Sequence, residues 1–162
     1  MENLKNVKWL KVISCIILVF AIANVFTIFT SSDMKNYYSS LVKPKLIPPP
    51  IVFIIAWSIL YSLMGISLYV ISEKTTDLDL KKDSYFIFFT QLFLNALWTP
   101  VYFSLKLRLP ALLIIILMLI LVIYMIFLFS KTNKFAAYIQ IPYAIWLCFA
   151  LYINLATYIL NG

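Results

Sequence analysis

Aromatic and amide side chains recur at helical spacing in three apolar runs of the chain, where they could recognise a ligand. The three stripes are Trp57, Tyr61, Met64 and Gly65; Gln91, Asn95, Trp98 and Tyr102; and Tyr143, Trp146, Ala150, Asn154 and Thr157. Steps of three and four residues put each stripe on one face of a helix. Indole and phenol rings suit a flat, largely apolar ligand, and a few amides can orient it by hydrogen bonds. We therefore expect the stripes to line a pocket.

Other chemistries are excluded by what the sequence lacks. Because the chain has no histidine, we exclude zinc hydrolysis, a Ser-His-Asp triad and a histidine-ligated haem. Gly65 and Gly162 are the only glycines, so there is no glycine-rich phosphate loop. No charged residue falls near the centre of an expected helix, which argues against a proton-coupled pump or a charged ion filter. We predict no metal site, no required cofactor and no catalytic residue of these classes.

The elements that carry the stripes are membrane-spanning helices. Hydrophobic residues make up 64% of the chain and charged residues 12%, with a mean hydropathy of +0.99. Five uncharged runs of at least 21 residues are present: Val12–Ser32, Leu46–Ser72, Ser84–Leu105, Leu109–Ser130 and Phe135–Gly162. At roughly 1.5 Å per residue, each is long enough to cross a hydrocarbon core of roughly 30 Å. In the hydrocarbon core only helices and closed β-barrels satisfy all backbone hydrogen bonds. Because these runs lack the alternation of polar and apolar residues found in barrel strands, we expect helices.

We therefore predict an all-α membrane protein, a five-transmembrane-helix bundle in one domain (1–162). The expected helices cover about residues 8–31, 48–72, 84–105, 109–130 and 135–160. The first run also resembles a cleavable signal peptide, with Lys5, Lys8 and Lys11 before an apolar core and the small residues at 21–23. Because the apolar character continues through Phe29, we favour a retained span.

Loops and prolines predict how the helices are joined. Residues 33–45 and 73–83 are expected to be loops, the second a solvated connector. Three prolines, 48–50, should set where the second helix enters the membrane. Pro100 and Pro142 are expected to interrupt and kink the third and fifth helices, shaping a pocket near one membrane face between the first, second, third and fifth helices. The fourth helix is aliphatic all round, which predicts lipid on most of its faces.

The net charge of +7 indicates membrane-flanking residues rather than a nucleic-acid surface, because the 13 basic residues are spread over short loops. When the loops are assigned alternately to the two sides of the membrane, eight basic residues lie on the side of the N-terminus and five on the opposite side. This distribution favours a cytoplasmic N-terminus. All-helical spans favour the cytoplasmic membrane of a bacterium.

Three segments carry a resemblance to a known family. KPKLIPPPIVFIIAWSILYSLMGISLY, QLFLNALWTPVYF and IPYAIWLCFALYINLATYILN resemble, in order, the helix 2, helix 3 and helix 5 signatures of the TspO/MBR family. These tryptophan-rich sensory proteins include the mitochondrial translocator protein. The resemblance implies a five-helix bundle, often a homodimer, that binds porphyrins such as protoporphyrin IX. In animal members it also implies cholesterol and synthetic drug ligands.

The resemblance also implies a site. The matching positions are Trp57, Tyr61, Asn95, Trp98, Trp146, Ala150 and Asn154. From the residues alone, we would favour packing for Trp57 and Trp146, and the resemblance favours pocket lining instead. Asn95 and Asn154 could be interhelical hydrogen-bond partners or could contact the ligand. Two departures are Leu46, where many members have tryptophan, and the absence of a basic residue after Tyr152 and Tyr158, which makes cholesterol doubtful.

Three functions stay open at this point. The first is porphyrin binding, as a sensor, carrier or regulator of tetrapyrrole handling. The second is light-dependent porphyrin breakdown, which the resemblance implies for some bacterial members with tryptophans as electron donors, here Trp57 and Trp146. The third is transport of another small apolar solute.

Overall fold

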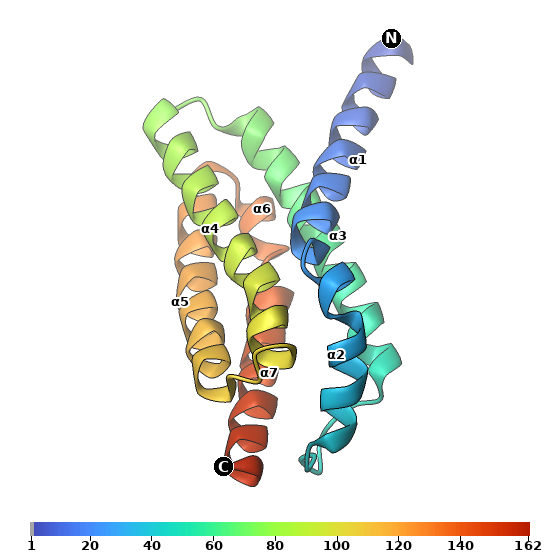
Figure 1. Ribbon diagram of the computed structural model, residues 1–162. Coiled ribbons are helices and arrows are strands. Elements are labelled where there is room, and N and C mark those ends of the chain that lie inside the picture. Colours follow the sequence, from blue (N-terminus) through green and yellow to red (C-terminus); the bar gives the residue numbers. More distant parts are fainter. Residues whose placement is uncertain (1) are drawn as a thin grey trace.

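The computed structural model describes the backbone of residues 2–162 and the side chains of residues 8–37 and 39–162, so the side chain of Lys5 lies outside the described residues. All elements of this part of the chain are helices. They are α1 (Glu2–Asn24), α2 (Thr27–Ser40), α3 (Pro50–Lys74), α4 (Leu78–Phe103), α5 (Arg108–Thr132), α6 (Lys134–Tyr138) and α7 (Ile141–Asn161). The two termini lie at opposite ends of the bundle (Figure 1), as an odd number of spans requires.

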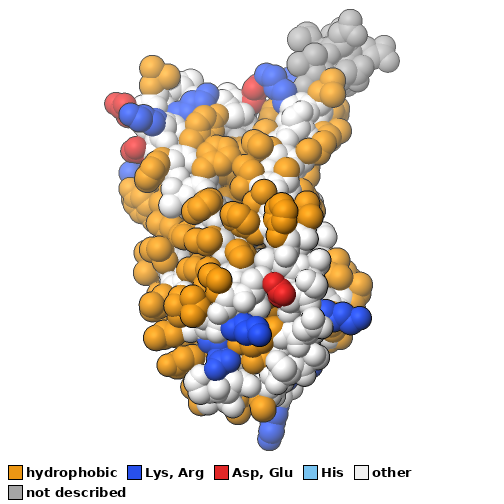
Figure 2. Space-filling view, in the orientation of Figure 1, with side chains coloured by type: hydrophobic (Ala, Val, Ile, Leu, Met, Phe, Trp, Pro, Cys, Tyr) orange, Lys and Arg blue, Asp and Glu red, His pale blue; other side chains and the backbone are white. Residues whose placement is uncertain are grey.

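The helices confirm an all-α membrane protein. Four segments are long and apolar enough to cross a bilayer: α3, α4, α5 and the segment Lys134–Asn161, which comprises α6 and α7. The bent pair α1 and α2 completes five if it is counted as one span. Hydrophobic side chains cover the middle of the face shown in Figure 2, while Lys and Arg lie mostly toward its ends.

The first span differs from the prediction. The expected helix over 8–31 and loop over 33–45 are wrong, because the chain bends at residues 25–26 and stays helical to Ser40. The segments Lys8–Asn24 and Thr27–Tyr37 meet at 51°. No proline or glycine occurs between residues 26 and 40 to stop a helix, and the helix ends shortly before Pro44. A polar composition marked the end of the apolar run but not the end of the helix.

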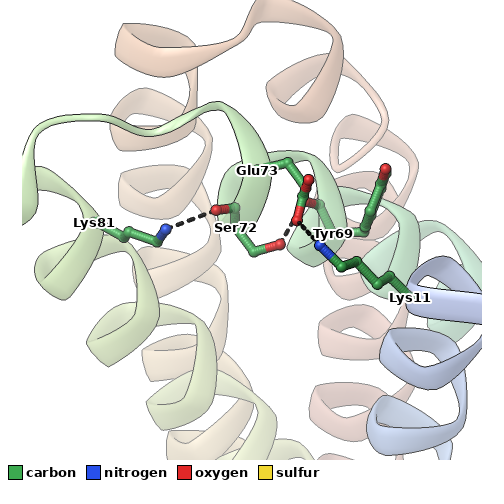
Figure 3. Close-up of polar contacts among 5 residues, drawn as sticks. All are labelled: Lys11, Tyr69, Ser72, Glu73 and Lys81. Carbon is green, nitrogen blue, oxygen red and sulfur yellow. Dashed lines mark hydrogen bonds and ion pairs between the residues drawn. The ribbon is translucent and has the colours of Figure 1, made fainter. Parts of the chain in front are cut away.

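The charged segment 73–83 is also mostly helical, so the predicted long connector is wrong. Only residues 75–77 join α3 to α4, and Asp77 caps α4 by accepting a hydrogen bond from the Leu80 N–H at 2.9 Å. Lys81 Nζ donates to the Ser72 carbonyl oxygen at 2.7 Å, and Lys11 Nζ pairs with Glu73 Oε1 at 2.8 Å (Figure 3). These contacts tie α1 and α4 to the C-terminal end of α3.

The prolines act mainly at helix starts. Pro49 is the extended N-cap residue of α3 and Pro50 its first residue, as predicted. Pro142 begins α7 after a break that separates it from α6, and Pro100 lies in the last turn of α4, which continues to Phe103. The expected interruption is confirmed at Pro142, because the helix breaks at residues 139–140, just before this proline. It is wrong at Pro100, where α4 continues without a break to Phe103. The Pro100 ring removes one N–H from the last turn, so the Ala96 carbonyl loses its hydrogen bond within the helix.

Helix packing explains where space is left in the bundle. α1 packs against α3, α2 against α4, and α7 against α5. The aliphatic α5 buries one stripe against its neighbours, which includes Ile115, Met118, Val122 and Met125. At Gly65 in α3, an added Cβ atom would lie 2.5 Å from Ile16 Cα, so α1 and α3 are in backbone contact there. The remaining space lies among α2, α3, α4 and α7.

Candidate ligand cavity

A cavity of about 730 Å³ occupies this space. Its walls come from α1, α2, α3, α4 and α7, with Ile115 and Met118 of α5 also contributing. All seven residues predicted for the site lie in its wall: Trp57, Tyr61, Asn95, Trp98, Trp146, Ala150 and Asn154. They come from three helices that are distant in the sequence, so the fold brings together what the spacing only suggested.

Aromatic rings of α3 and α7 form one side of the cavity. Trp57 is stacked on Tyr61 with ring centroids 5.2 Å apart and lies edge-to-face against Trp146 at 6.4 Å. Trp146 in turn meets Phe53 at 5.7 Å. Trp57 is one turn before Tyr61, so helical spacing alone sets that stack. Trp57 thus packs within the protein and also lines the cavity, which joins the two roles that the sequence left open.

A chain of hydrogen bonds crosses the bundle beside these rings. Tyr61 Oη donates to Asn95 Oδ1 at 2.9 Å, Asn95 Nδ2 donates to Tyr143 Oη at 3.2 Å, and Tyr143 Oη donates to Gln91 Oε1 at 3.0 Å. The chain joins α3, α4 and α7 and satisfies polar groups that would be costly in an apolar interior. Asn95 is therefore both an interhelical hydrogen-bond partner and part of the cavity wall.

The α4 and α7 walls are joined by a second polar contact. Trp98 Nε1 donates to Asn154 Oδ1 at 3.3 Å, and Asn154 Nδ2 donates to the Ala150 carbonyl oxygen of its own helix at 2.9 Å. Trp98 also stacks on Tyr102 with ring centroids 4.9 Å apart. The buried Nε1 of Trp146, by contrast, has no acceptor among the described residues. Trp98 is held in one orientation by a hydrogen bond, whereas Trp146 is held only by ring packing.

Sequence reasoning missed the wall that α2 supplies. Thr27, Ser31, Met34 and Lys35 line the cavity, followed by Lys43 of the next loop. The bend at residues 25–26 places α2 there, rather than the kinks expected at the two prolines. Steps of four and three between Thr27, Ser31 and Met34 are the same helical signal that identified the other stripes. It was overlooked because the segment is polar and was expected to be a loop.

Polar contacts hold this wall at the C-terminal end of the bundle. Ser104 Oγ donates to Asp33 Oδ2 at 2.6 Å, and an Arg108 guanidinium nitrogen donates to Tyr37 Oη at 2.8 Å. The same guanidinium donates to the carbonyl oxygens of the last two residues, at 2.9 and 2.6 Å. These bonds fasten α2 to the α4–α5 turn and to the end of α7, which stabilises the cavity mouth.

The chemistry of the cavity follows from its lining residues. The described residues contain no group of three or more Cys, Asp or Glu placed to hold a metal ion. What the cavity offers is aromatic surface, a few amides and hydroxyls, and a boundary of apolar side chains. Such a lining orients an apolar molecule by stacking and a small number of hydrogen bonds.

Comparison with known proteins identifies the family of the chain. The profile of the TspO/MBR family matches residues 15–160. The tryptophan-rich protein TspO of Archaeoglobus fulgidus is 37% identical over 154 residues, which cover 94% of this chain and 98% of that protein. Protein CrtK of Rhodobacter capsulatus is 32% identical over 125 residues, covering 77% and 78%. The translocator protein of Homo sapiens is 28% identical over 127 residues, covering 78% and 75%. With a match across nearly its whole length, this multi-pass membrane chain belongs to the TspO/MBR family.

Proposed function

We propose that the cavity binds a porphyrin-type ligand and that the protein acts as a sensor, carrier or regulator of tetrapyrrole handling. The observation that carries this proposal is a cavity of about 730 Å³ whose wall includes three of the chain's four tryptophans. Sites for small molecules commonly measure roughly 300–1,000 Å³ and are mostly apolar. A flat tetrapyrrole presents two large π faces to such a wall. Relatives named as a sensory protein and as a translocator protein are consistent with a role in ligand handling.

The test is a titration of the detergent-solubilised protein with protoporphyrin IX in darkness. We expect saturable, micromolar binding that quenches tryptophan emission, because a porphyrin stacked on an indole accepts its excitation energy. The double variant Trp57→Phe/Trp146→Phe should bind about tenfold more weakly, equivalent to about 1.4 kcal/mol. Affinity is read from the porphyrin absorption band as well, since removing tryptophans alters the emission itself.

Trp9→Phe is the matched control for this variant. Trp9 is 67% exposed on α1, away from the cavity, and its replacement should leave the affinity unchanged. If the double variant binds protoporphyrin IX as tightly as the wild type, the ligand does not use the cavity and the proposal is wrong.

The same samples separate the two alternative functions. Loss of the porphyrin absorption band only under illumination with dioxygen, and not in the double variant, would indicate light-dependent breakdown. Trp57 and Tyr61, stacked at 5.2 Å, are the residues that favour this reading, because oxidisable rings would lie beside the ligand. Absence of saturable porphyrin binding together with solute flux in vesicles would indicate a transporter instead.

A further inference from the structure

The mouth of the cavity differs chemically from its interior. Among the described residues that line it, Lys35 and Lys43 are the only charged ones, and no acidic side chain lines it. Lys35 belongs to α2 and Lys43 to the loop that follows, at the end of the bundle where the α4–α5 turn and the C-terminus also lie. The aromatic wall around Trp57 and Trp146 begins one to two turns further into the membrane along α3.

These two lysines differ from Lys106 and Arg108 of the same end in that they border the cavity. Lys45, two residues from Lys43, is exposed and is not part of the lining. Membrane-flanking charge explains all of these residues as a class, but it does not explain why two of them border the one large apolar cavity described.

Resting on the proposed function, we propose that Lys35 and Lys43 select ligands that carry carboxylates along one edge of an apolar, planar body. The body stacks in the aromatic interior while the carboxylates stay at the mouth beside the two ammonium groups. Both lysine side chains are exposed in the structure, so the ammonium groups keep most of their hydration and pairing costs little desolvation. A neutral ligand of the same shape loses this interaction, and a cationic one is repelled.

The neighbouring acidic group weakens the positive field of the two lysines at the mouth, but it is not part of the lining. Asp33 lies on α2 two residues before Lys35, but its carboxylate accepts a hydrogen bond from Ser104 at 2.6 Å and does not line the cavity. The charge that faces the ligand entrance is therefore positive. It also favours encounter with anionic ligands, an effect that salt screens over about 8–10 Å.

The experiment compares protoporphyrin IX, a dicarboxylic acid, with its neutral dimethyl ester in neutral detergent without added lipid. The two probes partition into detergent differently, so the measured quantity is the change in the acid-to-ester affinity ratio between variant and wild type. For Lys35→Gln/Lys43→Gln we expect this ratio to fall about tenfold, from the loss of two partly exposed charge pairs. The ester affinity should stay unchanged, which also shows that the variant is folded. Lys45→Gln is the matched control and should keep the wild-type ratio.

Each outcome has a distinct meaning. A ratio that falls in the double lysine variant and not in the control supports the proposal. A ratio that stays unchanged in the double variant, or falls equally in Lys45→Gln, overturns it while leaving porphyrin binding in place. If the wild type binds neither probe, the proposed function itself is wrong and the selection by the lysines falls with it.

Discussion

Replacing Gly65 by alanine would put a methyl group into the backbone of α1. The new Cβ atom would lie 2.5 Å from Ile16 Cα, 2.8 Å from Ile16 N and 2.7 Å from Ile16 Cγ1, whereas ordinary contacts begin at 3.4 Å. The two helices would have to separate by about 0.9 Å, the difference between 3.4 and 2.5 Å. Two of the three contacts are with backbone atoms, which cannot turn aside as the end of a side chain can.

The loss in free energy of unfolding caused by Gly65→Ala can be estimated from typical values. Overpacking of this kind costs about 1–3 kcal/mol, and the better helix propensity of alanine returns at most about 1 kcal/mol. We expect a net loss of roughly 1–2 kcal/mol, which for a chain of this size lowers Tm by roughly 2–8 °C. The measurement is thermal unfolding in detergent, followed by tryptophan fluorescence.

Two further variants make the test specific. Adding Ile16→Ala to Gly65→Ala removes the side-chain contact but leaves both backbone contacts, so it should not restore the wild-type Tm. Ser62→Ala, in the same helix, removes only a hydroxyl that bonds to the Ser58 carbonyl oxygen of its own helix, and it should change Tm little. A Gly65→Ala protein as stable as the wild type, or full rescue by Ile16→Ala, would refute the reasoning.

Two other perturbations follow from the polar contacts. Tyr143→Phe removes the hydroxyl that donates to Gln91 Oε1 and accepts from Asn95 Nδ2. These two buried atoms lose their partner, although Asn95 Oδ1 keeps the hydrogen bond from Tyr61, so we expect a cost of about 1–3 kcal/mol, seen as a lower Tm. An unchanged Tm would contradict this role of the Tyr143 hydroxyl. Arg108→Gln removes the guanidinium that donates hydrogen bonds to Tyr37 and to the C-terminal carbonyl oxygens. Amide hydrogen exchange in α2 should therefore become faster, while exchange in α5 should not change. If α2 exchanges at the same rate in the variant and in the wild type, Arg108 does not hold α2 in place.

The site could be predicted from the sequence to the extent that it depends on local spacing. Trp57 and Tyr61 stand four residues apart, so any helix places them on one face and the stack follows. Asn95 and Asn154 must find partners in an apolar interior, so their inward orientation was expected before the structure was known. Pro50 could likewise be assigned to a helix start, because the fixed φ and missing N–H of proline suit the first turn.

The hydrogen-bond partner of each buried polar side chain could not be predicted, because it depends on how far apart the helices lie and how they are rotated. Nothing in the stripes indicated that Asn95 would bridge Tyr61 and Tyr143, or that Asn154 would accept from Trp98. The helical state of α2 was missed for a related reason. Its polar residues do not look like a membrane span, and its contacts with α4 and with Arg108 come from residues about 70 positions away.

By itself, the sequence determined the class of protein, the apolar spans and the face of each helix that carries aromatic and amide groups, since hydrocarbon leaves the backbone no alternative to helices and penalises unpaired amides. Only the tertiary structure decided that α2 closes the cavity, that Gly65 is where α1 and α3 touch, and that Lys35 and Lys43 border the mouth while Lys45 does not. Those features follow from distances between helices, and such distances arise from packing among residues far apart in the chain.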